Sequence, residues 1–146
     1  MEMDEVIEER EEKKIVDIFA DHGEGYFRQR EKAVLQDIAK RSNLVVSCGG
    51  GVVIDEENIQ ILKKTGFMIC LTASPEVIYE RINLCTKRPL LQVTNPKEKI
   101  RELLSKRQAH YAQAHYCIDT SSLSVQEVAE KIVALLSNDK KNITNS

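Results

Sequence analysis

The chain has 146 residues, of which 42% are hydrophobic and 30% charged, a composition typical of one folded domain with its own core. A net charge of -2 at pH 7 gives no electrostatic reason to expect a nucleic acid or an anionic membrane as partner. No apolar run reaches the length of a membrane span, and the acidic N-terminal residues are unlike a signal peptide. Four dispersed cysteines without a C-x-x-C pair are typical of reduced thiols, so we expect a cytoplasmic protein.

The first third of the chain predicts two helical segments. Asp4 is expected to cap a helix, and the polar run at residues 10–14 is expected to interrupt it. An apolar stripe resumes at Ile15 and ends at the glycine-containing residues 21–25. A second helix is predicted from about residue 26 to residue 41. Its predicted buried face consists of Phe27, Val34, Leu35 and Ile38.

A charge-free apolar run at residues 44–48 is typical of a buried parallel strand, and three consecutive glycines at 49–51 follow it. Glycine has no Cβ, so the backbone here can bring bare N–H groups close to a ligand. In open α/β sheets, ligands bind outside the carboxyl ends of the strands. Taken alone, the triplet supports a tight turn and a ligand-binding turn about equally.

The second half of the chain alternates short strands with helices. Strands are predicted at residues 67–71 and 116–119. Helices are predicted at residues 55–64 and 75–84, and further helices are expected to begin at Asn95 and Ser124. This alternation predicts βαβ units, and therefore an α/β protein with a parallel sheet.

Several charged residues outside the triplet could carry chemistry, although each has an ordinary structural explanation. Glu2 and Asp4 are two carboxylates two positions apart, for which surface charge plus a helix cap is the favoured explanation. Arg28 lies close to Arg30 and Glu31 in the second predicted helix, and a solvated helix face is favoured there.

The remaining candidates are basic residues and histidines. Arg88 follows Lys87 in a loop-like stretch, and this pair suits a phosphate-covering lid and an ordinary surface loop equally well. A second basic pair lies at residues 106–107. His110 and His115 are five positions apart and do not share a helix face, so a metal-binding pair is rejected.

Taken jointly and in order, the motifs are far more specific than any one of them. They are Met3-Asp4 with Ile7-Glu8, Phe19-Ala20 through Gly23-Glu24 to Phe27-Arg28 and Glu31, Gly49-Gly50-Gly51, Arg88-Pro89-Leu90-Leu91, and Lys106-Arg107 with Tyr111. This set resembles the shikimate kinase family. The resemblance implies one domain over residues 1–137, with a lid at about 86–95 and a flexible tail at 138–146. It also implies the P-loop kinase fold, a three-layer α/β structure related to nucleoside monophosphate kinases.

The same resemblance implies an activity, transfer of the γ-phosphate of ATP to the 3-hydroxyl of shikimate in the biosynthesis of chorismate and the aromatic amino acids. Shikimate is then the small-molecule partner, ATP the co-substrate and Mg²⁺ the expected metal ion, and the family is monomeric. Asp4 would hold the ring hydroxyls and act as the base. Arg28 and Arg107 would clamp the shikimate carboxylate, and Gly50 would contact the substrate.

Two more arginines are assigned to the nucleotide by the resemblance. Arg88 matches the lid arginine that closes over the nucleotide phosphates. Arg81 lies where a second nucleotide-side arginine occurs in the family. Positioning and charge neutralisation are most of phosphoryl-transfer catalysis, so arginines suit these roles.

The sequence departs from the family at its start. The family begins with a strand, a G-x-x-x-x-G-K-[ST] loop and a helix, and that motif does not occur in the 146 residues. Glu2 replaces the first of two family aspartates and could reach Mg²⁺ through a water molecule. In the family, the absent strand lies between those matching residues 44–48 and 67–71. Either these two strands close up, or their edges stay open and favour self-association.

The departure leaves two hypotheses. The first is a shikimate kinase, N-terminally truncated in this sequence and inactive as the bare chain. The alternative is a degenerate, non-catalytic remnant that binds shikimate or a partner without turnover.

Overall fold

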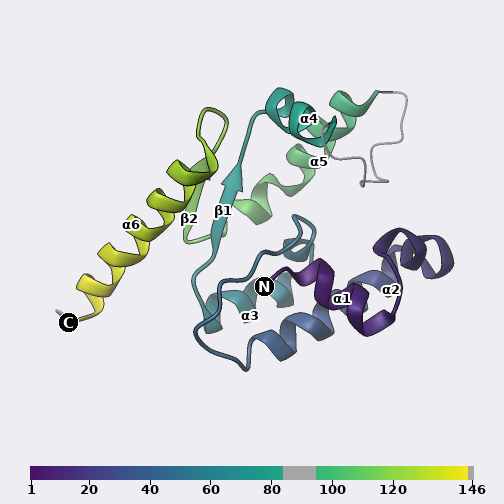
Figure 1. Cartoon of the computed structure of the whole chain (residues 1–146), viewed down its shortest axis with the longest axis horizontal. Coiled ribbons are helices and arrows are strands. Elements are labelled where there is room, and N and C mark those ends of the chain that lie inside the picture. The colour runs from purple at the N-terminus through teal and green to yellow at the C-terminus, as the bar shows by residue number, and fades with distance from the viewer. Residues whose placement is uncertain (84–94, 145–146) are drawn as a thin grey trace. The chain divides into compact units, whose positions relative to one another are not determined.

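The computed structural model describes residues 1–83 and 95–144 (Figure 1). The elements in chain order are α1 (Met3–Glu11), α2 (Ile15–Ile38), the 3₁₀ helix η1 (Val52–Ile54), α3 (Glu56–Thr65), β1 (Ile69–Thr72), α4 (Pro75–Asn83), α5 (Pro96–Tyr111), β2 (Tyr116–Asp119) and α6 (Val125–Thr144). The chain divides into two compact units. The first unit comprises residues 1–68 and 107–113, and the second comprises the described residues within 69–106 and 114–146.

Helices α1 and α2 pack together and contribute most of the buried apolar side chains of the first unit. The polar run at residues 10–14 separates them as predicted, and Glu12 adopts a left-handed conformation with φ 52°. The prediction that Asp4 caps α1 was wrong, because Glu2 occupies the N-cap position and Asp4 lies in the first turn. The backbone N–H of Met3 donates to the Ser47 carbonyl oxygen at 3.0 Å, so a backbone partner replaces the expected side-chain cap.

Helix α2 contains the predicted interruption. Gly23 has φ 77° and ψ 177°, a conformation that only glycine adopts readily, and it breaks the helical path between two regular stretches. The second stretch ends at Ile38, three residues earlier than expected. Its predicted buried face is confirmed for Phe27, Val34, Leu35 and Ile38.

The strand predicted at residues 44–48 does not form. The segment makes one parallel bridge, between Glu2 and Ser47, and Val45 is 87% exposed. A strand needs a partner along its length, and the pairing segment turns into α1 at Met3 after a single bridge. The glycine triplet therefore follows an irregular segment.

The second unit contains a parallel pair of strands, as expected. Ile69 of β1 lies opposite Tyr116 of β2, and the pairing continues to Thr72 opposite Asp119. The strand predicted at 116–119 has the observed bounds, whereas the one predicted at 67–71 begins and ends later. In Figure 1 the β1–β2 pair runs between α6 and α4. This α/β arrangement is the predicted fold class.

The helix starts of the second unit follow the predicted capping signals. The Ser74 hydroxyl accepts from the Val77 N–H at 3.3 Å at the start of α4. At the start of α6, the Ser124 hydroxyl accepts from the Glu127 N–H and the Glu127 carboxylate accepts from the Ser124 N–H. Helix α6 continues to Thr144, so the backbone of the predicted tail is helical to that position, and its flexibility stays a prediction. Of the predicted lid, residues 86–94 lie outside the described residues.

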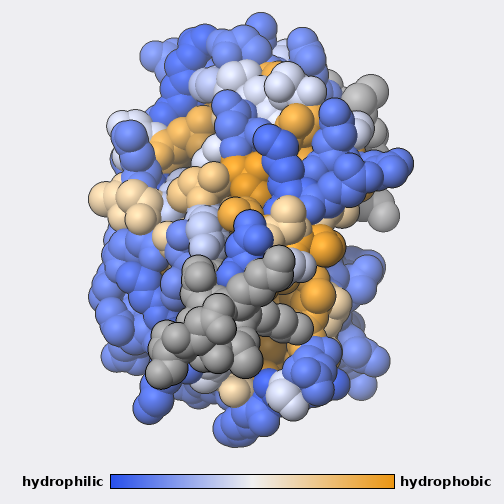
Figure 2. All heavy atoms as spheres, turned by 90° about the vertical axis from the view of Figure 1, so that its left-hand side faces the viewer, coloured by the Kyte–Doolittle hydropathy of each residue, from blue (hydrophilic) through white to orange (hydrophobic). Residues whose placement is uncertain are grey.

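Hydrophobic side chains reach the surface in both units (orange in Figure 2). In the sheet of the described residues β1 pairs with β2 alone, and Leu71 of β1 is 52% exposed. An apolar strand with an unpaired edge is a template for association, so self-association stays a prediction. No helix within the described ranges is both long and apolar enough to span a bilayer.

Asn58 should be a stabilising residue of the first unit. Its side chain is 2% exposed, and its Nδ2 donates to the Val52 carbonyl oxygen of η1 at 2.9 Å. We expect Asn58→Ala to lower the free energy of unfolding by about 1–3 kcal/mol, because the buried carbonyl loses its donor. Urea denaturation measures this effect.

Gln60→Ala provides the matched control, because this amide on the same helix is exposed and bonds only to the Glu56 carboxylate. A change within about 0.5 kcal/mol is expected there. Equal losses in the two variants would show that burial of Asn58 does not determine its contribution.

Candidate active site

The backbone of the glycine triplet presents donors. The Gly49 carbonyl oxygen accepts from the Val52 N–H at 3.1 Å, and that of Gly51 accepts from the Ile54 N–H at 3.0 Å. The Gly50 carbonyl oxygen accepts from the Tyr111 hydroxyl at 3.0 Å. Within the described part of the chain, the N–H groups of the three glycines donate no hydrogen bond. The carbonyl oxygens of the turn are therefore hydrogen-bonded within the protein, whereas its backbone N–H groups are available to a ligand.

Arg28 lies directly against this turn. A Cβ at Gly51 would lie 2.5 Å from both terminal nitrogens of the guanidinium, closer than real atoms approach. Only glycine at this position leaves space for the arginine. Arg28, which the sequence assigns to the substrate, therefore lies beside the glycine triplet, and its role stays a prediction.

Glu31 fixes the position of Arg28. The Arg28 Nη1 donates to Glu31 Oε2 at 2.7 Å, and its Nε and Nη2 donate to Glu24 Oε1 at 3.3 and 3.1 Å. Glu31 is 2% exposed, so the favoured explanation of a solvated surface was wrong for this residue, whereas Arg30 is exposed as expected. Spacing could have shown this, because Glu31 lies four residues after Phe27 and three before Val34, both buried.

The electrostatics of the site centre on Glu31. Burial raises the pKa of Glu31 above its ordinary value, and the negative charge of Asp4 raises it further. Arg28 and Arg107 act in the opposite direction without cancelling the effect of burial. Burial also lowers the pKa of Arg28, but its bonds to Glu31 and Glu24 outweigh this and leave the pKa raised.

Carboxylates line the other side of the turn. A Cβ at Gly49 would lie 3.6 Å from Asp4 Oδ1 and 4.0 Å from Glu31 Oε1. Burial raises the pKa of the neighbouring Cys48 thiol to about 11, with further contributions from the charges of Glu31, Glu2 and Asp4. At neutral pH this thiol stays protonated, so it is not an activated nucleophile.

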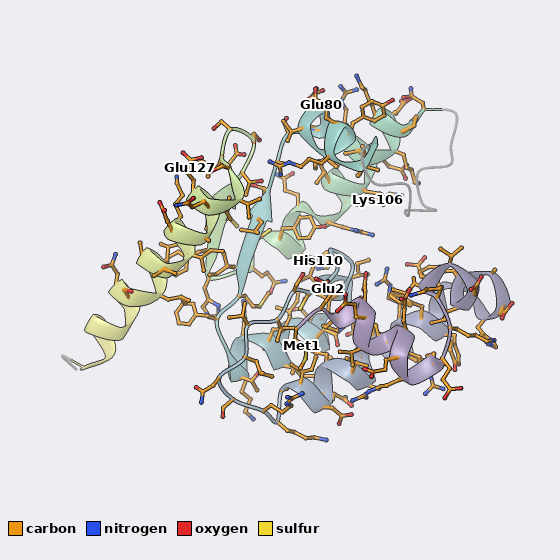
Figure 3. All side chains as sticks on the ribbon, viewed as in Figure 1. Met1, Glu2, Glu80, Lys106, His110 and Glu127 are labelled. Carbon is orange, nitrogen blue, oxygen red and sulfur yellow. The ribbon has the colours of Figure 1, made fainter. Side chains whose placement is uncertain are left out.

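Helix α5 supplies a second cation. Arg107 and Tyr111, one turn apart, approach Gly50, where a Cβ would lie 3.7 Å from Arg107 Nη1 and 3.0 Å from the Tyr111 oxygen. Four predicted substrate residues, Asp4, Arg28, Gly50 and Arg107, thus gather within the first unit. Glu2 and His110, labelled in Figure 3, belong to the same unit.

The two predicted nucleotide arginines lie elsewhere in the chain. Arg81 belongs to the second unit, where its Nη1 donates to Thr120 Oγ1 at 2.9 Å and its Nη2 to the Thr120 carbonyl oxygen at 2.7 Å. Thr120 follows β2 directly, so Arg81 is held at the carboxyl end of a parallel strand. Arg88 lies outside the described residues.

The described residues do not include a cluster of protein ligands for a metal ion. No group of three or more His, Cys, Asp or Glu side chains within residues 1–83 and 95–144 could hold a metal ion. The motif that would supply a lysine and a metal-binding hydroxyl does not occur in the 146 residues. In kinase sites Mg²⁺ is commonly held by one or two carboxylates together with water molecules and substrate phosphates, so its approach to Glu2 through water stays a prediction. No chemical step is therefore assigned to the metal ion here.

The buried carboxyl of Glu31 predicts a pH dependence of stability. The folded state holds its proton more tightly than the unfolded chain, where the pKa is near 4.5. Stability should therefore fall as pH rises from about 4.5 through the folded-state pKa. Glu31→Gln cannot titrate, so the free energy of unfolding of the wild type minus that of the variant should decrease across this window. Urea denaturation between about pH 4 and 8 measures it.

Glu24→Gln is the matched control, because Glu24 binds the same guanidinium but its side chain is 62% exposed. The decrease assigned to Glu31 should persist in that variant. A wild type that gains stability relative to Glu31→Gln with rising pH would contradict the assignment.

The chain is similar in sequence and in structure to known shikimate kinases. The family model described as shikimate kinase matches residues 1–137. The shikimate kinase of Thermodesulfovibrio yellowstonii is 47% identical over 133 residues, 91% of this chain and 77% of the relative, and that of Thermoanaerobacter pseudethanolicus is 44% identical, over 91% and 78%. The structure of shikimate kinase from Acinetobacter baumannii in complex with shikimate matches with a TM-score of 0.90 and 36% identity, over 95% of this chain and 78% of that one. The chain belongs to the shikimate kinase family.

Proposed function

We propose that the first unit binds shikimate and presents its 3-hydroxyl for phosphorylation by ATP. The observation that carries this proposal is the approach of two guanidinium groups to one glycine turn, Arg28 at Gly51 and Arg107 at Gly50. Membership of the family, and the shikimate named for the Acinetobacter baumannii structure, support the choice of ligand.

The free donors of Arg28 suit a carboxylate. A guanidinium has five N–H donors, and three groups of Arg28 are engaged by Glu31 and Glu24. Two N–H donors therefore have no acceptor among the described residues, enough for one bidentate carboxylate. Because Glu31 and Glu24 hold the guanidinium in place, little of its freedom is lost when the ligand binds.

The remaining groups suit a ring with several hydroxyls. Backbone N–H groups of the glycine turn can donate to ligand oxygens, and the Asp4 carboxylate can accept from ligand hydroxyls. Asp4 would take the proton of the 3-hydroxyl as the new oxygen–phosphorus bond forms and the bond to the leaving ADP breaks. Arg81 and Arg88 are proposed to bind the nucleotide. The reaction is proposed to take place in the cytoplasm.

A second candidate function is shikimate binding without turnover. It is favoured by one observation, that no glycine-rich phosphate loop with its lysine occurs in the 146 residues. Both candidates share the acceptor site and differ only in whether a γ-phosphate is held in line with the hydroxyl.

The two clamp arginines should each contribute to shikimate affinity. We expect Arg28→Ala and Arg107→Ala to weaken binding by about 1.5–3 kcal/mol each, the value of a charge-assisted hydrogen bond. Isothermal titration with shikimate measures the loss.

Arg30→Ala is the matched control, because Arg30 lies on the same helix but pairs with Glu11 and stacks on Tyr26. Its affinity should equal that of the wild type. If neither clamp variant binds more weakly than this control, the carboxylate clamp is wrongly placed.

The 146-residue chain assayed alone should show no measurable ATP-dependent phosphorylation of shikimate. Placing the reacting groups in line supplies roughly 7–11 kcal/mol of barrier lowering, and the proposed lid arginine Arg88 cannot replace the phosphate loop and its lysine in doing so. A coupled assay of ADP release tests this prediction. A chain that carries a family-type strand, phosphate loop and helix before Met1 is the positive control. Turnover of the bare chain near about 1 s⁻¹, an ordinary kinase rate, would show that other residues hold the phosphates.

A further inference from the structure

We infer that Tyr111 is a positioning residue of the shikimate site, because its hydroxyl sets the direction of the peptide group between Gly50 and Gly51. The inference rests on the proposed function, since it adds a residue to the same site. Tyr111 acts through the backbone and not by touching the substrate.

The hydrogen bond of Tyr111 fixes a donor as well as an acceptor. Its hydroxyl donates to the Gly50 carbonyl oxygen at 3.0 Å. A peptide group is planar, and the described chain has no cis peptide bond, so the Gly51 N–H points away from that carbonyl. Holding the oxygen toward Tyr111 therefore aims the Gly51 N–H in the opposite direction, as a donor available to a ligand.

Tyr111 is the long-range restraint on this turn. The carbonyl groups of Gly49 and Gly51 are held by N–H groups three residues later, within the turn itself. The Gly50 carbonyl is held from α5, 61 residues away in the sequence. Glycine is the most flexible residue, so a peptide between two glycines needs such an external contact to keep one orientation.

Helix α5 carries Arg107, one of the two proposed carboxylate-binding arginines, as well as Tyr111. Arg107 and Tyr111 lie one turn apart on α5 and both face Gly50, where a Cβ would lie 3.7 Å from Arg107 Nη1 and 3.0 Å from the Tyr111 oxygen. A side chain at residue 50 would have to displace the tyrosine hydroxyl first. The Tyr111 hydroxyl therefore occupies the space that a side chain at residue 50 would need, and it also orients the backbone N–H donors of the turn.

Titration of the whole 146-residue chain with shikimate tests the inference. Tyr111→Phe keeps the ring and removes only the hydroxyl, and we expect affinity to fall by about three- to tenfold, the effect of one hydrogen bond. Tyr26→Phe is the matched control, since its hydroxyl donates to Glu11 at 2.6 Å within the same unit, outside the site. It should bind like the wild type.

A double substitution separates positioning from general loss of structure. Gly50→Ala should weaken binding in the wild type, because its Cβ meets the Tyr111 oxygen at 3.0 Å. In a Tyr111→Phe background that oxygen is gone, so the same substitution should cost less, and the two effects should not add. General loss of structure would instead add the costs and lower the unfolding midpoint.

The outcomes are distinguishable. A wild-type chain that does not bind shikimate overturns the proposed function and this inference with it. A wild-type chain that binds shikimate, with Tyr111→Phe equally tight, overturns the inference alone. Additive costs for Gly50→Ala and Tyr111→Phe also overturn it.

Discussion

The site depends on one buried ion pair, between Glu31 and Arg28. A carboxylate that is 2% exposed is tolerated only with a partner, and Arg28 supplies it at 2.7 Å. Glu31 lies on the face of α2 that packs into the core, so its side chain has little freedom to move. The Arg28 guanidinium that is bonded to it is therefore held in one position. Its fixed position in turn requires Gly51, since no Cβ fits beneath it. The buried charge thus determines both the position of the cation and the shape of the backbone at the proposed substrate site.

A second constraint acts on the same turn from α5. Tyr111 holds the Gly50 carbonyl while Arg107 lies beside it, so the turn is restrained by side chains from two helices. Arg28 limits the space at Gly51, and Tyr111 limits it at Gly50. The glycines are therefore required by two close approaches, and φ is positive at neither of them. Because the turn is already restrained before binding, less conformational entropy of the protein is lost when a small anionic ligand binds.

Much of this fold could be predicted from local patterns, and the failures have physical causes. The buried face of α2 and the capping box at Ser124 were predicted correctly because both depend on residues within one or two turns. The strand at 44–48 was not, because a strand is defined by its partner, and here the pairing ends at one bridge. Glu31 was assigned to solvent because it is charged, although its spacing placed it among core residues. The contact of Tyr111 with Gly50 joins residues 61 positions apart, which no local pattern reveals.

Substrate binding and turnover are physically separable in this chain. The proposed acceptor site is held by contacts internal to the first unit, Arg28 to Glu31 and Tyr111 to Gly50, and neither contact involves a nucleotide. Holding a γ-phosphate needs a different set of groups, backbone donors and a lysine, that the sequence does not contain as a motif. An active kinase and a binding remnant would therefore share the same clamp and the same glycine turn. Shikimate affinity reports on the clamp in either case, and only phosphate transfer distinguishes the two.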